Sequence, residues 1–148
     1  MKHQVNYKVE LDGITYQNLT EDYEKEIHDF YWDVFLKDEP TTVAAGGYKE
    51  RHPNIVKQVE EIIQDGVSLI ALDGHNLIGM MLSHTVHRNQ VEKRSNFAEN
   101  FKIYPELHAS IMTLFDEIMY PGDIFEAHPH DTKFYDMFTL ATKSGYRG

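Results

Sequence analysis

The sequence predicts a mixed α/β (α+β) fold, in which a mostly antiparallel sheet is flanked by helices. Alternating apolar residues surround an Asp12-Gly13 step near the start of the chain, a pattern typical of a strand or hairpin. Residues 20–37 and 53–66 carry apolar residues at helical spacing. Two apolar runs joined by a short turn at residues 73–76 predict an antiparallel hairpin. The expected order is β (or ββ)-α-α-β-β-α-β, in one domain spanning residues 1–148.

The composition is that of a globular protein, with 41% hydrophobic and 26% charged residues. The net charge of −10 argues against nucleic acid as a partner, because phosphate backbones require basic surfaces. An acidic field suits a cationic small molecule, although solubility alone also explains it. The sequence has no cysteine, no secretory signal and no apolar run near the roughly 20 residues of a membrane helix. We therefore expect a cytoplasmic protein without a membrane partner.

The first predicted helix is apolar over more than half of its circumference. One stripe comprises Ile27, Phe30, Tyr31, Val34 and Phe35, and the helix is expected to end near Lys37. Trp32 and Leu36 lie off this stripe. Either the helix is buried on two sides or one side lines a pocket, and burial is the more common case.

The second predicted helix begins at Pro53 and ends at a Gly66 C-cap, after a mobile loop at residues 41–51. The strongly apolar hairpin after this helix is expected to have both faces covered.

A polar loop is predicted for residues 88–102. The third helix is expected between Pro105 and Pro121, with its buried face formed by Ile111, Leu114, Phe115 and Ile118. An irregular stretch at 122–133 precedes the final strand, residues 137–142, and a Ser-Gly turn.

Two acids, Asp38 and Glu39, stand immediately before Pro40, at the predicted end of the first helix. Carboxylates at a helix C-terminus oppose the macrodipole. Such a placement is understandable if one of them serves a site, and two solvated acids are the alternative.

Three segments carry a resemblance to a known family. They are F-L-K-D-E-P-T-T at residues 35–42, the hairpin V-S-L-I-A-L-D-G-H-N-L-I-G-M-M-L at 67–82, and a terminal strand that runs into G-Y-R-G at 145–148. Together they resemble the Gcn5-related N-acetyltransferases (GNAT), and within them the arylalkylamine or dopamine N-acetyltransferases. The resemblance implies a GNAT-like fold, acetyl-CoA as co-substrate and a primary (arylalkyl)amine as the acetyl acceptor.

The same resemblance assigns roles to residues. Glu39 matches the glutamate that acts as general base, taking the proton of the amine directly or through water. Residues Leu140, Ala141 and Thr142 correspond to the strand beside the pantetheine arm, whose backbone N–H groups stabilise the oxyanion. Arg147 and Gly148 begin the loop that binds the pyrophosphate.

The substrate pocket is expected to include Trp32 and Pro40. At position 41 this chain has Thr where family members often have Leu, a difference that alters the wall near the amine.

The family's acetyl-CoA loop continues beyond Y-R-G. The resemblance therefore implies that the sequence covers the N-terminal portion of the domain, with the C-terminal half missing. We expect such a chain to be inactive or nearly so, because most of the cofactor site would lie in the missing part. We also expect it to be poorly stable or self-associating, because its last strand forms an apolar edge. The alternative is a non-catalytic chain or pseudoenzyme that binds a protein through this strand. The sequence leaves the oligomeric state open.

Metal binding is not expected. His84 and His87 are three apart in a strand-like segment, so they point to opposite faces. The cluster His128, His130 and Asp131 is the remaining candidate, but surface histidines in a loop are the simpler interpretation.

Overall fold

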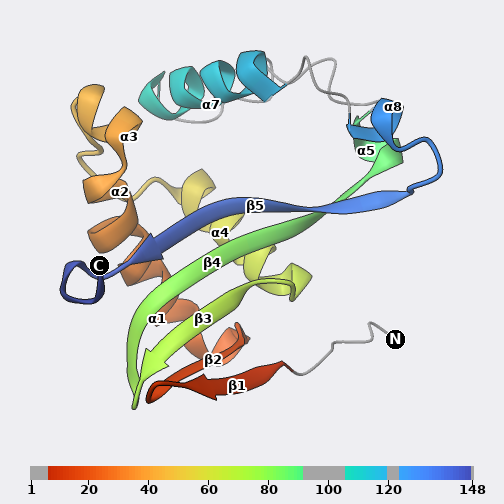
Figure 1. Ribbon diagram of the computed structural model, residues 1–148. Coiled ribbons are helices and arrows are strands. Elements are labelled where there is room, and N and C mark those ends of the chain that lie inside the picture. Colours follow the sequence, from red (N-terminus) through yellow and green to blue (C-terminus); the bar gives the residue numbers. More distant parts are fainter. Residues whose placement is uncertain (1–6, 92–105, 120–123, 148) are drawn as a thin grey trace.

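Five antiparallel strands form one sheet in the order β1-β2-β3-β4-β5, with α1 and α4 on one of its faces (Figure 1). The computed structural model describes residues 7–91, 106–119 and 124–147. The strands are β1 (Lys8–Leu11), β2 (Ile14–Asn18), β3 (Leu69–Asp73), β4 (Asn76–His87) and β5 (Lys133–Thr142). The predicted fold class is confirmed.

Along the chain, the described α-helices lie between β2 and β3 and between β4 and β5. The described helices are α1 (Glu24–Phe30), α2 (Leu36–Asp38), α3 (Pro40–Ala44), α4 (Pro53–Asp65), α5 (Arg88–Val91), α7 (Glu106–Met119) and α8 (Ile124–Ala127). A π-helical segment, Tyr31–Phe35, joins α1 to α2, and 3-10 turns cover Glu21–Tyr23 and Ser144–Tyr146. Among the described helices, none combines the length and the apolar character that a membrane span requires.

Two local predictions are confirmed by backbone geometry. Asp12 and Gly13 have φ values of 52° and 80°, as a two-residue turn between β1 and β2 requires. Gly66 ends α4 in the left-handed region, with φ 74° and ψ 19°. These positions could be predicted because short-range sterics decide them.

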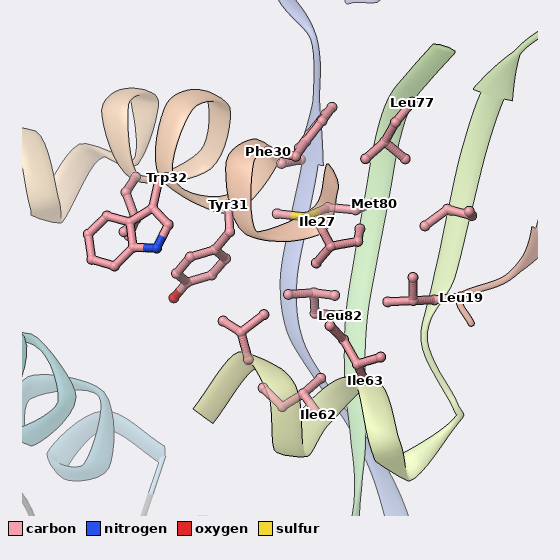
Figure 2. Close-up of a cluster of buried hydrophobic side chains, with 14 of the residues drawn as sticks. Leu19, Ile27, Phe30, Tyr31, Trp32, Ile62, Ile63, Leu77, Met80 and Leu82 are labelled. Atoms are coloured by element: carbon pink, nitrogen blue, oxygen red, sulfur yellow. The ribbon is translucent and has the colours of Figure 1, made fainter. Parts of the chain in front are cut away.

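The core lies between the sheet and the α1–α4 layer. Ile27 on α1, Val59 on α4 and Leu82 on β4 have no exposed surface. Figure 2 shows Leu77, Met80 and Leu82 along β4, with Tyr31 and Trp32 at the end of the cluster farther from that strand. Burial of such side chains contributes about 1.5–3 kcal/mol each.

The π-helical segment changes which residues of the first helix are buried. Ile27, Phe30 and Tyr31 are buried as predicted, but Val34 and Phe35 are only half-buried. Trp32 and Leu36, both off the predicted stripe, are each 7% exposed. A π turn inserts about one residue into the helix and rotates the residues after it, so the straight-helix prediction fails at this point.

Several coarse predictions are wrong. The expected loop at 41–51 begins with α3, and the loop at 88–102 begins with α5, its residues 92–102 lying outside the described ranges. The irregular stretch at 122–133 contains α8. Each of these helices is four or five residues long, too short for apolar periodicity to register.

The last strand and the third helix also differ from expectation. β5 starts at Lys133, four residues before the predicted start at 137. On α7, Leu114 is 46% exposed although its spacing predicted burial. Pro105, Pro121 and the side chains of Phe115 and Ile118 lie outside the described part of the structure.

The second face of the sheet is partly exposed. β3 alternates between buried and half-buried residues, and Met81 on β4 is half-buried. Tyr135, Met137 and Leu140 on β5 are 63%, 57% and 64% exposed. The expectation that both faces of the hairpin are covered holds in part: residues 77–80 of β4 are buried in succession, whereas alternate residues of β3 are half-buried.

Candidate functional site

Glu39 lies at the junction of two short helices. Its backbone N–H donates to the carbonyl of Phe35 at 2.8 Å, ending the first helical region. Its carboxylate accepts from the backbone N–H groups of Thr41 at 3.0 Å and Thr42 at 2.5 Å, and from the Thr41 hydroxyl at 2.5 Å. Glu39 is thus the N-cap of α3, with Pro40 in the first turn.

The electrostatic environment of Glu39 therefore differs from the one that the sequence suggested. A carboxylate at the N-terminus of a helix is favoured by the exposed N–H groups, whereas the sequence suggested only an unfavourable C-terminal position. Partial burial by itself raises the pKa of Glu39, but the hydrogen bonds from Thr41 and Thr42 outweigh it and lower the pKa below its ordinary value. The side chain is ionised at neutral pH.

Asp38 connects this junction to the end of β5. Its Oδ2 lies 2.7 Å from Nη2 of Arg147, and Nε of Arg147 donates to the carbonyl of Thr142 at 2.7 Å. The fold therefore brings together two segments that are 109 residues apart in the sequence. These are the two segments that carried the predicted base and the predicted pyrophosphate loop.

The predicted pantetheine strand forms the end of β5. Leu140, Ala141 and Thr142 pair with Met81, Met80 and Gly79 of β4. β5 is an outer strand of the described sheet, so one of its backbone edges has no strand partner among the described residues. Ala141 is buried and Leu140 exposed. Gly148 lies outside the described residues.

A pocket of about 430 Å³ lies beside the α1–α2 region. Its lining includes Trp32, Leu36, Val43 and Tyr48. The rings of Trp32 and Tyr48 meet edge to face with centroids 5.6 Å apart. Trp32 therefore contributes to a pocket wall, whereas Pro40 is exposed and absent from that lining.

Tyr48 and His108 form a polar pair behind this wall. The Tyr48 hydroxyl lies 2.7 Å from Nδ1 of His108, and His108 on α7 is 4% exposed. Burial, with a smaller contribution from the Glu39 charge, raises the pKa of Tyr48 to about 12. Burial, with a contribution from His52, lowers the pKa of His108 to about 4. Both side chains are thus neutral at pH 7.

No sequence signal pointed to this pair. Tyr48 comes directly after a Gly-Gly step in a predicted loop, and His108 is one of nine histidines. Only packing of α7 against α3 brings them together.

A larger hollow of about 910 Å³ lies away from Glu39. Its lining includes Thr20, Asp65, Ser83 and Tyr135, and none of the residues predicted to bind acetyl-CoA or the amine. The smaller pocket is therefore the better candidate for the amine, because its wall holds Trp32 and lies on the helices that lead to Glu39.

The histidines singled out in the sequence form no metal site in the described residues. His128 Nδ1 lies 3.8 Å from Oδ2 of Asp131, and both side chains are more than 60% exposed. His130 is exposed as well. His84 instead lies 3.7 Å from Asp136 on the neighbouring strand.

Solved structures of insect N-acetyltransferases share this arrangement of elements. Arylalkylamine N-acetyltransferase 2 from Aedes aegypti matches 93% of this chain with a TM-score of 0.80 and 20% identity. A putative arylalkylamine N-acetyltransferase 7 from the same mosquito matches 98% with a TM-score of 0.77 and 16% identity. The Drosophila melanogaster polyamine N-acetyltransferase, which catalyses the formation of N-acetylagmatine, matches 91% with a TM-score of 0.74 and 15% identity.

The chain spans 62–64% of the length of these three proteins. No protein-family model and no curated protein matches the sequence. The fold expected from the D-E-P segment, the hairpin and the terminal strand is nevertheless confirmed by three-dimensional likeness. The chain has the GNAT fold of the arylalkylamine and polyamine N-acetyltransferases.

Proposed function

We propose that this chain carries part of the active site of an acetyl-CoA-dependent N-acetyltransferase, which transfers an acetyl group to a primary amine of the arylalkylamine class. The observation that supports it most directly is the Asp38–Arg147 ion pair of 2.7 Å. It joins the D-E-P segment to the turn after β5, which supports a site where the proposed base lies beside the proposed cofactor-binding edge.

Glu39 is the general base in this proposal. Its carboxylate is ionised at neutral pH because hydrogen bonds from Thr41 and Thr42 lower its pKa. A low pKa limits its strength as a base. In this role Glu39 accepts the proton of the ammonium group, directly or through water, as the amine attacks.

The acetyl-CoA edge is formed by residues 140–142 and Arg147. Acetyl-CoA supplies an acetyl group activated as a thioester. The unpaired backbone edge of β5 suits an extended chain of amide groups, as a further strand would. Arg147 provides a guanidinium next to that edge. Two of its nitrogens contact Asp38 and the Thr142 carbonyl, and the remaining N–H donors of this 43% exposed side chain suit a phosphate.

The amine pocket is the hollow beside Trp32 and Tyr48. Two aromatic rings at right angles offer both a ring face and a ring edge to an arylalkyl group. The net charge of −10 attracts a cationic amine. The aromatic rings favour an aromatic monoamine, whereas the negative charge attracts the dication agmatine at least as strongly, so agmatine is the alternative substrate.

The experiment is a thiol-release assay on the protein that contains this chain, with acetyl-CoA and either phenylethylamine or agmatine. Glu39→Gln is expected to lower kcat/KM about 100-fold, most strongly below the pKa of the amine. The matched control is Glu26→Gln, which neutralises an exposed acid on α1 and is expected to retain activity.

Two outcomes contradict the proposal at different levels. Equal rates for Glu39→Gln and wild type across the pH range remove Glu39 from the role of base. Absence of both acetyl transfer and acetyl-CoA binding removes the enzymatic function and favours the non-catalytic alternative.

A further inference from the structure

A cluster of three potential metal ligands lies between α1 and α4, away from Glu39. It comprises Glu24 and His28 on α1 and Glu60 on α4, and one ligand atom from each lies within 4.8 Å of the other two. It is the one such group of three that the described residues contain. No metal site was expected here from the sequence, because one of these ligands is on a different helix from the other two.

Helix geometry and core packing fix the positions of the three residues. Glu24 and His28 are four apart, so they lie on the same face of α1. Ile27 on α1 and Val59 on α4 have no exposed surface and pack in one core cluster. The residues next to them in the chain, His28 and Glu60, are therefore held at the boundary where the two helices meet.

His28 is the most unusual member of the cluster. Both of its ring nitrogens are fully buried, and neither has a hydrogen-bond partner in the described structure. A neutral imidazole always has one N–H donor and one acceptor nitrogen. Leaving such groups buried and unpaired is unfavourable, and none of the described residues supplies the partner that this ring needs.

The two carboxylates of the cluster also have no basic side chain as an ion-pair partner among the described residues. Nearby acids on the same helices do have such a partner: Asp29 on α1 lies 3.2 Å from Lys25, and Glu61 on α4 lies 3.6 Å from Lys57. Glu24 and Glu60 form no ion pair with any described residue, although they approach each other. A bound cation would offset their mutual repulsion and give His28 its missing partner.

We propose that Glu24, His28 and Glu60 form a divalent transition-metal site, of which Zn²⁺ is the representative ion. One imidazole nitrogen and two carboxylate oxygens are a ligand set that Zn²⁺ accepts, whereas Mg²⁺ prefers oxygen alone. Zinc bonds of about 2.0–2.1 Å separate tetrahedral ligands by about 3.3 Å. A small rotation of the exposed Glu24 side chain closes the site, and solvent supplies the remaining ligand. The metal clamps α1 to α4.

The test is calorimetric titration of the protein with ZnCl2 near pH 7, with MgCl2 in parallel. We expect one saturable zinc site, and His28→Gln and Glu60→Gln to weaken its affinity at least tenfold. Glu61→Gln is the matched control on the same helix, and His130→Gln is the control for surface histidines. Both controls are expected to bind zinc as wild type does.

Substitution with Co²⁺ gives a second readout, because visible absorption bands of the protein-bound ion depend on its ligands. These bands are expected to be lost in His28→Gln, provided that circular dichroism shows the variant folded. If His28→Gln does not fold, Glu60→Gln serves the same purpose. Equal zinc affinity in wild type and both cluster variants overturns the proposal, as does equal binding of Mg²⁺ and Zn²⁺. The metal site does not depend on acetyltransferase activity.

Discussion

Glu39 ends one helix and begins the next, and this double position is the physical reason why the D-E-P sequence occurs where it does. Its backbone closes the first helical region on Phe35, while its carboxylate caps α3. The sequence identified the residue through an apparent conflict with the helix dipole. The structure resolves that conflict at Glu39, and at Asp38 through the ion pair with Arg147.

His108 makes stability depend on pH. Its pKa is about 4 in the fold and 6.5 ordinarily, so the fold favours the neutral ring. The stability from this group is complete above about pH 6.5 and is lost as the pH falls towards 4. Between pH 7 and pH 5 the free energy of unfolding should fall by about 2 kcal/mol on this account.

Urea unfolding of wild type and His108→Gln at pH 7 and pH 5 measures this effect. The variant is expected to be less stable at pH 7 and to lose less stability on acidification. His130→Gln, at an exposed position, is expected to behave as wild type does. A parallel pH dependence in wild type and His108→Gln would exclude a buried neutral ring at this position.

Among the secondary-structure elements, β5 has a bulge opposite Leu82 and Ser83 of β4, and a buried serine holds the β4 backbone at this point. The Ser68 hydroxyl donates to the carbonyl of Ser83 at 3.1 Å and accepts from its N–H at 3.0 Å. The register of β4 against β5 shifts between Leu82 and Ser83, so the backbone of Ser83 lies at an irregularity of the ladder. Ser68 has no exposed surface.

Ser68→Ala is expected to reduce the free energy of unfolding by about 1–3 kcal/mol, because two buried backbone groups lose this partner. Ser83→Ala is the control, since the two hydrogen bonds use the Ser83 main chain and survive the substitution. Chemical denaturation of both variants checks the difference. A larger loss in Ser83→Ala than in Ser68→Ala would assign the stability to packing of Ser83 instead.

For the molecule as a whole, the exposed side of β5 predicts association. β5 is an outer strand of the described sheet, and three of its side chains, Tyr135, Met137 and Leu140, are more than half exposed. Apolar residues on an open edge favour pairing with another chain. The 148-residue polypeptide is therefore expected to self-associate as its concentration rises.

Light scattering coupled to size-exclusion chromatography measures this tendency. Met137→Lys is expected to shift the protein towards the monomer, because a buried ammonium at the contact is unfavourable. Ile124→Lys, at an exposed apolar position on α8, is the control and should associate as wild type does. A monomeric wild type at all concentrations contradicts the prediction.

The GNAT resemblance rested on three segments that are similar to those of a known family. Local sequence patterns were sufficient to predict the order of the main strands and helices, the Asp12-Gly13 turn and the Gly66 cap. These features depend on apolar periodicity and on the backbone freedom of single residues, which are local properties. Short helices such as α3 and the π-helical segment escaped prediction, because too few residues carry a periodic signal.

Contacts between distant groups, in contrast, exist only in the folded chain. The Asp38–Arg147 pair, the Tyr48–His108 pair and the Glu24–His28–Glu60 cluster each join segments that no local pattern connects. Their contacts arise because burial of apolar side chains fixes how the helices pack on the sheet. The backbone positions that this packing fixes then determine which polar side chains come into contact.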